Sequence, residues 1–407
     1  MYAKTFLVPN RYHQHNVNNV SQAIIIPSHN PSPLTLTLLC QILDWNPGIH
    51  IYLVDDSTPI ECQEGLRIFD TALKLFPQVM VIRTSSNKLK AGAINYGLNR
   101  LARCDTPLPD IIFTCDDDIW ITPGTLTGMT RALMADDRLG AVCSQSWVTN
   151  KNQNLLTRLQ ALEYFGFNAA RLTDEGFYQG PLVMHGMLTA FRTQALLGAG
   201  GFNEQSLIED YEITTRLKEQ GWHVRMARNA LAWTTVPTKF SQLWKQRVRW
   251  TYGGLTVLAK CRHWPSIIQD VFGHVLFFGT LAAIAIFFLF PFSINGFHGS
   301  WPRLLGRIII LLSLAQFMIS YLFQVWILRY YHEKDKWDWF LRLSILPEFI
   351  YANILSLVLI GSYVFFTFNA LSRRLSVSAT GLGIFIRLVR SGFKKIGFTE
   401  TWGTRVA

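Results

Sequence analysis

The stretch "DIIFTCDDD", residues 110–118, decides the fold. An apolar run that is short enough for one buried strand ends in three adjacent carboxylates, Asp116, Asp117 and Asp118. Like charges this close repel one another, so either their pKa values rise or a cation offsets the repulsion. The stretch predicts a strand whose end carries a binding site; the alternative is that the acids only form a solvated turn.

The same form occurs three times upstream of this stretch. The apolar runs that end in polar residues are "QAIIIPSHN" (22–30), "IHIYLVDDSTP" (49–59) and "VMVIRTSSN" (79–87). Amphipathic stretches at 65–76 and 90–102 lie between the runs, and this alternation predicts a parallel sheet that is covered on both faces. Ligands of such sheets bind beyond the carboxyl ends of the strands. The polar clusters at 27–30, 55–58, 84–90 and 116–118 are therefore expected to form one site.

The composition predicts that part of the chain lies in a membrane. Of the 407 residues, 49% are hydrophobic and only 16% are charged, and the apolar excess follows Val271. The stretches 274–294, 304–328 and 346–368 are each long enough to cross a bilayer, which takes about 20 residues. The third begins with Pro347 and Glu348, so a buried helix remains an alternative for it. The N-terminus has no apolar run of signal length, which predicts that the first domain stays in the cytosol.

The net charge and the cysteine spacing indicate what kinds of partner and compartment suit the protein. A net charge of +11 in a membrane protein indicates cytoplasmic flanks, anionic lipid or an anionic substrate rather than nucleic acid. The six cysteines show no paired spacing, which suits a reducing compartment and argues against zinc.

Several groups of residues are candidates for binding or catalysis, and most of them also have a purely structural interpretation. Carboxylates at a strand end suit Mg²⁺ or Mn²⁺. Lys90 stands at a helix start, as a phosphate contact or as a surface lysine. Glu209 and Asp210 precede an amphipathic helix and would otherwise be helix caps. Gln246, Arg249 and Trp250 share one helical face, which suits a sugar and a diphosphate or an ordinary interfacial helix.

The order of these pieces resembles the membrane-integrated, processive family 2 glycosyltransferases, the group of poly-N-acetylglucosamine, hyaluronan, chitin-oligosaccharide and cellulose synthases. The motifs that carry the resemblance are "KAGAIN" (90–95), Asp116–Asp118, Ile208-Glu209-Asp210, Gln246-x-x-Arg249-Trp250 and "TWGTR" (401–405). The chain departs from the family at Ser28-His29-Asn30, where Tyr before Asn is common, at His185, where Ser is usual, and at Ile208, which replaces Thr.

The resemblance implies a role for each matching residue. Asp56 would bind the uracil of a UDP-sugar donor, Lys90 and Arg249 the diphosphate, and Asp116 and Asp118 a Mg²⁺ or Mn²⁺ ion. Asp210 would be the general base of an inverting transfer, with Glu209 beside it, and Trp250 would stack on the acceptor sugar. The remaining expected positions are Pro27, His29 and Asp117 for the donor, Gln246 and Gly186 for the acceptor, and Trp402, Thr404 and Arg405 for a gate over the donor.

The resemblance also implies an architecture: an α/β catalytic domain of the GT-A (Rossmann-like) type, followed by interfacial and transmembrane helices. The expected parts are an N-terminal extension (1–22), the catalytic domain (23–240), amphipathic interfacial helices (241–270), a transmembrane region (271–370) and a basic cytosolic tail with the gating segment (371–407). Because the tail is basic and its gate must reach the donor, we expect an even number of crossings, 274–294 and 304–328. The segment 346–370 would then be re-entrant or interfacial.

Three functions fit these observations. The first is a synthase that elongates and exports a β-linked polysaccharide at the inner membrane, with its catalytic domain in the cytoplasm. The second is a single-transfer enzyme that glycosylates a membrane lipid, and the third is an inactive membrane scaffold on the same fold. The expected partners are a UDP-sugar, a growing glycan or lipid acceptor, membrane lipids and a small membrane subunit, with no nucleic acid.

Overall fold

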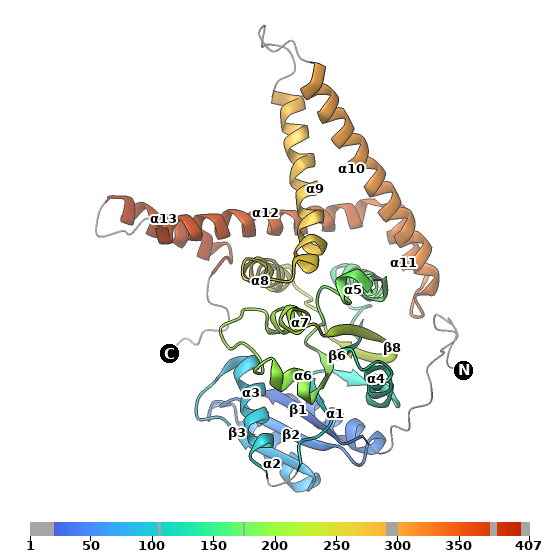
Figure 1. The fold of residues 1–407 in the computed structure, drawn as a ribbon, viewed down its shortest axis with the longest axis vertical. Coiled ribbons are helices and arrows are strands. Elements are labelled where there is room, and N and C mark those ends of the chain that lie inside the picture. Colours follow the sequence, from blue (N-terminus) through green and yellow to red (C-terminus); the bar gives the residue numbers. More distant parts are fainter. Residues whose placement is uncertain (1–19, 105–106, 174–175, 290–299, 375–380, 400–407) are drawn as a thin grey trace. The chain divides into compact units, whose positions relative to one another are not determined.

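The computed structural model describes residues 20–104, 107–173, 176–289, 300–374 and 381–399, in two compact units (Figure 1). The first unit combines everything up to His263 with the segment from Leu346 onward, and the second unit is Trp264–Ile345. Each unit is described by itself below.

The first part of the chain forms the parallel half of a sheet, as the sequence predicted. Strands β1 (Gln22–Ser28), β2 (His50–Asp55), β3 (Val79–Arg83) and β4 (Ile111–Cys115) pair in the order β3-β2-β1-β4, all parallel. Helices α1 (Pro33–Trp45), α2 (Gln63–Leu75) and α3 (Leu89–Ala102) connect them. The Ser32 hydroxyl accepts a hydrogen bond from the Leu34 amide and so caps α1, and Pro33 suits its first turn.

The second half of the sheet is mixed, which the strand pattern did not predict. Strand β7 (Leu188–Arg192) runs antiparallel between β4 and β6 (Leu139–Val148). Beyond β6 come β8 (His223–Thr234), parallel to β6, and the short β5 (Trp120–Ile121), antiparallel to β8. The helices of this half are α4 (Thr125–Met134), α5 (Leu155–Thr173), α6 (Thr193–Gly198) and α7 (Glu209–Glu219), with a short 3₁₀ turn η2 (Gly176–Tyr178).

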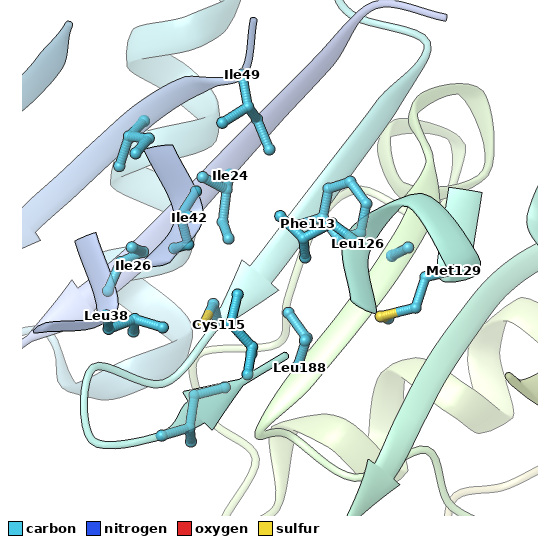
Figure 2. Close-up of a cluster of buried hydrophobic side chains, with 14 of the residues drawn as sticks. Ile24, Ile26, Leu38, Ile42, Ile49, Phe113, Cys115, Leu126, Met129 and Leu188 are labelled. Carbon is cyan, nitrogen blue, oxygen red and sulfur yellow. The ribbon is translucent and has the colours of Figure 1, made fainter. Parts of the chain in front are cut away.

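Two apolar layers cover the faces of the sheet. Because side chains alternate along a strand, Ile24 and Ile26 of β1 face one layer, whereas Ala23 and Ile25 face the other. Figure 2 shows the first layer, where Leu38 and Ile42 of α1 lie near β1 while Leu126 and Met129 of α4 lie near Phe113 of β4. Helices α3, α6 and α7 contribute to the second layer. This packing fixes the carboxyl ends of β1, β2 and β4, from which the site is built.

The first unit continues in a helical layer. Helix α8 (Phe240–Leu258) contacts α12 (Leu346–Arg374), and the two lie beside each other in Figure 1. The segment after α13 (Gly381–Lys395) also packs here: the Trp244 indole N–H donates to the Ile396 carbonyl at 2.7 Å. Phe398 is buried among the aromatic rings of Trp244, Phe365 and Phe393. The C-terminal segment is therefore fastened to the helix that carries Gln246, Arg249 and Trp250.

The second unit consists of helices α9 (Trp264–Leu289), α10 (Ser300–Ile327) and α11 (Lys336–Ser344), with a 3₁₀ turn η3 (Leu328–Tyr330). Helices α9 and α10 are in contact, and the hydroxyls of Thr280 and Ser313 form a hydrogen bond between them. Among the described residues, Arg307–Tyr330 and Leu346–Arg373 are long and apolar enough to cross a membrane. The first coincides with the predicted span 304–328, whereas the predicted span 274–294 ends in residues that the structure does not describe.

Candidate active site

A lysine lies at the centre of the predicted site. Lys90, in the first turn of α3, places its Nζ 2.5 Å from Asp116 Oδ1, 3.4 Å from Glu209 Oε1 and 2.9 Å from the Gly186 carbonyl oxygen. Burial alone would lower the pKa of Lys90, but the charges of Asp116, Glu209 and Asp210 outweigh it and the pKa is raised. The structure thus brings together residues from α3, the end of β4, the start of α7 and the loop before β7.

Gly186 holds this cluster together through its backbone. Its amide donates to Asp210 Oδ2 at 2.9 Å, while its carbonyl accepts from Lys90. A Cβ atom at this position would come within 2.7 Å of Lys90 Nζ and 3.3 Å of Asp210 Oδ2. A side chain here would displace the end of the lysine, so a glycine lets Lys90 and Asp210 approach the backbone this closely.

Asp210 has the properties of a base. Its Oδ1 accepts from the Tyr211 amide at 2.7 Å, and Oδ2 accepts from Gly186, so the carboxylate is fixed at the start of α7. Burial, followed by the neighbouring charge of Glu209, raises the pKa of Asp210 to about 6, against the lowering effect of Lys90. A carboxylate with such a pKa is deprotonated near neutral pH and takes up a proton more readily than an exposed aspartate.

The three adjacent acids have different surroundings. Burial, together with the charge of Asp118, raises the pKa of Asp116 to about 7, although Lys90 opposes this shift. Asp117 accepts a hydrogen bond from the Ser28 hydroxyl, which joins the ends of β1 and β4, and burial raises its pKa. Asp118 is exposed.

The carboxylates fit a divalent cation that is shared with a ligand. No group of three or more His, Cys, Asp or Glu side chains in the described part of the chain is arranged to hold a metal alone. Mg²⁺, however, is commonly held by one or two carboxylates together with substrate phosphates. Burial is the main cause of the raised pKa of Asp116, and the charge of Asp118 adds a repulsion that a cation would relieve. Asp116 and Asp118 therefore remain suitable ligands.

The predicted nucleotide residues gather at the ends of β1 and β2. Asp56 is buried, and its Oδ1 accepts from the Lys88 amide at 2.6 Å and from the Thr84 hydroxyl at 3.0 Å. The exposed His29 places Nδ1 2.9 Å from the Asp56 carbonyl oxygen, and Pro27 is buried in β1. One oxygen of Asp56 thus orders the 84–88 loop, a structural role that the sequence did not indicate.

His185, which replaces the usual serine, is structural in its contacts. Its ring is buried, with Nε2 2.6 Å from the Ser144 carbonyl oxygen. Burial, together with the charge of Arg171, lowers the pKa of His185 to about 3, so the ring is neutral and Nε2 is the donor. It positions the backbone next to Gly186.

The residues of α8 that the motif Gln246-x-x-Arg249-Trp250 marks lie in two environments. Gln246 and the exposed Arg249 line a cavity of about 700 Å³. The other lining residues come from the β6–α5 and β8–α8 loops and from α8 itself: Asn150, Gln153, Thr235, Val236, Pro237, Thr238, Gln242 and Lys245. Amides, hydroxyls and two cations, with no carboxylate in the lining, suit a hydroxylated and negatively charged ligand.

Trp250 lies in the second environment. The Arg247 guanidinium lies over the Trp250 ring, with its Cζ 4.2 Å from the ring centroid. The Trp250 ring also packs beside an apolar cluster that includes Tyr164 of α5. Sequence reasoning passed over Arg247, although its spacing of three residues from Trp250 on a helix was a usable signal. The predicted gate residues Trp402, Thr404 and Arg405 lie outside the described residues.

Comparison with known proteins identifies the class to which this site belongs. The profile described as "Glycosyl transferase family group 2" matches residues 111–328, more than half of the chain, and "Glycosyl transferase family 2" matches residues 23–196. The chain therefore belongs to the family 2 glycosyltransferases, as its motifs predicted.

Individual relatives share only about a quarter of their residues with this chain over the matched regions. The chain is 25% identical to the probable glycosyltransferase YdaM of Bacillus subtilis over 279 residues, 65% of each chain. It is 27% identical to the poly-beta-1,6-N-acetyl-D-glucosamine synthase of Staphylococcus epidermidis over 199 residues, 49% of this chain and 46% of the synthase. The matched regions thus span between about half and two thirds of these relatives.

A solved structure confirms the fold. The mannosyltransferase PcManGT from Pyrobaculum calidifontis, in complex with GDP-Man and Mn²⁺, superimposes with a TM-score of 0.50 at 17% identity. The match covers 85% of this chain and 86% of that one. The predicted GT-A type of α/β domain with long apolar helices after it is thus confirmed.

Proposed function

We propose that this chain is an inverting hexosyltransferase that uses a UDP-sugar and a divalent metal to elongate a β-linked polysaccharide. The observation that carries the proposal is the cluster of Lys90, Asp116, Gly186, Glu209 and Asp210 at the carboxyl ends of the strands. It holds a partly buried cation, a fixed carboxylate with a raised pKa and further acids within a few ångströms. These are the groups that glycosyl transfer from a nucleotide donor needs.

In this proposal Asp210 takes the proton from the acceptor hydroxyl. The Gly186 and Tyr211 amides each bind one of its oxygens and leave the carboxylate a free lone pair for that proton. The hydroxyl oxygen attacks the anomeric carbon from the face opposite the nucleotide, so a single base is sufficient and the configuration inverts.

The other residues act on the donor. Asp56 and His29 would contact the base, with Pro27 in the strand beneath them, and Asp117 holds the strand ends through Ser28. Lys90, which already lies between Asp116 and Glu209, would turn its positive charge to the diphosphate. Asp116 and Asp118 would hold Mg²⁺ or Mn²⁺, which would neutralise the negative charge that builds up on the departing nucleotide.

The cavity beside α8 would receive polar groups of the acceptor and of the nucleotide that lie away from the cluster around Lys90 and Asp210. Gln246 is placed for acceptor hydroxyls and Arg249 for the leaving diphosphate, since both line the same cavity. Trp402, Thr404 and Arg405 would close over the donor; the docking of Ile396 and Phe398 on the α8 layer supports a tail that returns to the catalytic unit.

Similarity to the staphylococcal synthase favours a polymer such as poly-N-acetylglucosamine, or a hyaluronan-like chain, over a single sugar added to a lipid. We also propose that the protein is embedded in the inner membrane with its catalytic domain in the cytoplasm, where UDP-sugars are found. A small membrane subunit would assist it.

The packing of α12 supports an even number of crossings. Tyr351, Val358, Phe365 and Asn369 are buried on the side that meets α8, whereas Ile350, Leu357, Val364 and Leu371 are exposed on the other side. The buried side extends over about 27 Å of helix, at 1.5 Å per residue. A helix that rests on the catalytic unit over this length would lie along the membrane surface rather than cross it, and the tail would then share the cytoplasmic side with the catalytic domain.

The test is to incubate the purified chain with labelled UDP-sugars and Mg²⁺ or Mn²⁺, and to size the product by gel electrophoresis. Long, glycosidase-sensitive chains made from one of these donors support the proposal. A single labelled lipid would favour the lipid-glycosylating alternative, and the absence of UDP release with every donor would favour the scaffold.

A further inference from the structure

Arg247 is a buried cation that the transfer described above does not use. It lies in α8 directly after Gln246, and its side chain is only 5% exposed. Its Nη2 is 2.5 Å from Glu163 Oε2 of α5 and 3.4 Å from the Tyr351 hydroxyl of α12. The same Glu163 oxygen accepts a hydrogen bond of 2.7 Å from Tyr351. Three helices are thus joined at one carboxylate oxygen.

A buried ion pair stabilises the packing of helices only weakly, because both charges lose their hydration. Removing two charges from water costs several kcal/mol per ion, and well-packed apolar residues of similar size often stabilise a fold equally well. In the described part of the chain, Arg247 Nε and Nη1 also donate to no acceptor, although both are buried. The arrangement is therefore not explained by stability alone.

The remaining contact of Arg247 gives a reason for its position. The guanidinium covers the ring of Trp250 at 4.2 Å, one helical turn further along α8. Beside the ring lies an apolar cluster formed by Val148, Ala161, Tyr164 and Val236. A planar cation that is itself fixed by Glu163 and Tyr351 therefore determines where the indole can lie.

We propose that Arg247, held by Glu163 and Tyr351, is a positioning residue that fixes the indole of Trp250 for the acceptor sugar. This inference rests on the proposed function and on the role that the sequence resemblance implies for Trp250, stacking on the acceptor sugar. The cation acts through Trp250 and touches no reacting atom, so its loss should weaken acceptor recognition and leave donor binding intact.

The test uses a double variant, Glu163→Leu with Arg247→Met, in the full-length protein. It removes both charges and keeps the approximate side-chain volumes, so no buried charge is left unpaired. Among the described residues, only the Tyr351 hydroxyl loses its acceptor, so the variant should stay folded and melt a few degrees below the wild type. With UDP-N-acetylglucosamine and an N-acetylglucosamine oligosaccharide as probes, the acceptor KM should rise about threefold to thirtyfold, the range that cation–π contacts contribute. The donor KM should stay at the wild-type value, because neither residue contacts the donor in the proposed function.

Two further variants make the result specific. Arg247→Lys in the presence of Glu163 keeps the charge and should restore part of the acceptor affinity. Arg138→Lys, a change in an exposed ion pair with Asp136, should alter neither KM. An unchanged acceptor KM in the double variant, or an equal rise in both KM values, would overturn the positioning role.

A second readout does not depend on activity. In protein labelled with 5-fluorotryptophan, the Trp250 fluorine resonance, assigned by its loss in Trp250→Phe, should shift and broaden in the double variant. An unchanged resonance would overturn the inference even if the wild type transferred no sugar to these probes. Conversely, a shifted resonance in a protein whose wild type releases UDP from no UDP-sugar would refute the proposed function and leave the positioning of Trp250 supported.

Discussion

At the scale of single residues, the candidate site depends on how closely its groups approach Gly186. Lys90, Asp210 and the backbone of this glycine form one hydrogen-bonded unit, with Asp116 and Glu209 paired to the lysine. Chemistry at such a site depends on distances of a fraction of an ångström, because misplacing a group by about 1 Å can cost a hundredfold in rate.

Gly186→Ala should therefore separate activity from stability. The new Cβ would meet Lys90 Nζ, the end of a flexible side chain that can move away cheaply, and then Asp210 Oδ2. We expect turnover to fall by about a hundredfold while the melting temperature changes little. Turnover near the wild-type value would show that the lysine and the base need not be held in this arrangement.

The acidity of Asp210 predicts a pH dependence. Its pKa is raised to about 6, and a general base must be deprotonated, so the base is lost as the pH falls through about 6. We expect kcat/KM, which reports the pKa values of the free enzyme, to rise between about pH 5 and pH 7 with a midpoint near 6 and to level off above it. The same midpoint in the residual activity of Asp210→Asn would assign the titration to another group, such as Asp116.

At the scale of elements, the tail is fastened to the α8 layer by close aromatic packing. Gly361 of α12 faces the buried ring of Phe398, and a Cβ there would collide with the tip of that ring. Gly392 of α13 has nothing within 4 Å of its Cβ position. The two glycines thus provide a matched pair for testing whether the tail must dock.

Gly361→Ala should loosen the tail, whereas Gly392→Ala should not, since it replaces an exposed helix glycine by a better helix former. We expect faster proteolysis between 381 and 399 in the first variant and, because the proposed gate residues follow this segment, lower turnover. Equal protease resistance in both variants would show that the Phe398 contact does not retain the tail.

The elements also show what the sequence could and could not predict. Strands β1 to β4 and their helices were readable because each pairing follows from a local alternation of apolar runs and amphipathic stretches. The antiparallel β7 was not, since it is a five-residue strand whose partners are set by long-range packing.

The same distinction holds for the site. Lys90, Asp116, Glu209 and Asp210 stand at element ends, where short motifs reveal them, and the structure brings all four together. The cluster of Arg247, Glu163 and Tyr351 joins residues 84 and 188 positions apart, and no local pattern encodes such a contact.

At the scale of the whole molecule, the account requires the tail and the catalytic domain to share one side of the membrane. The described tail and its flank carry Arg373, Arg387, Arg390, Lys394 and Lys395, and basic residues near membrane segments favour the cytoplasm. A cysteine added after Ala407, in a variant without its native cysteines, should be labelled only in opened cells. Labelling by a membrane-impermeant reagent in intact cells would place the tail outside and remove the proposed gate from the site.

The central claim is that Asp210 is the base of a UDP-sugar transfer, and Asp210→Asn tests it most directly. The measurement is UDP release with donor and acceptor present, beside equilibrium binding of UDP with Mg²⁺ or Mn²⁺ and with EDTA. The account predicts a loss of turnover of about 10²–10⁴-fold with nearly unchanged, metal-dependent UDP binding, because the base acts on the acceptor. Near wild-type turnover in this variant, or wild-type turnover that survives EDTA, would contradict it.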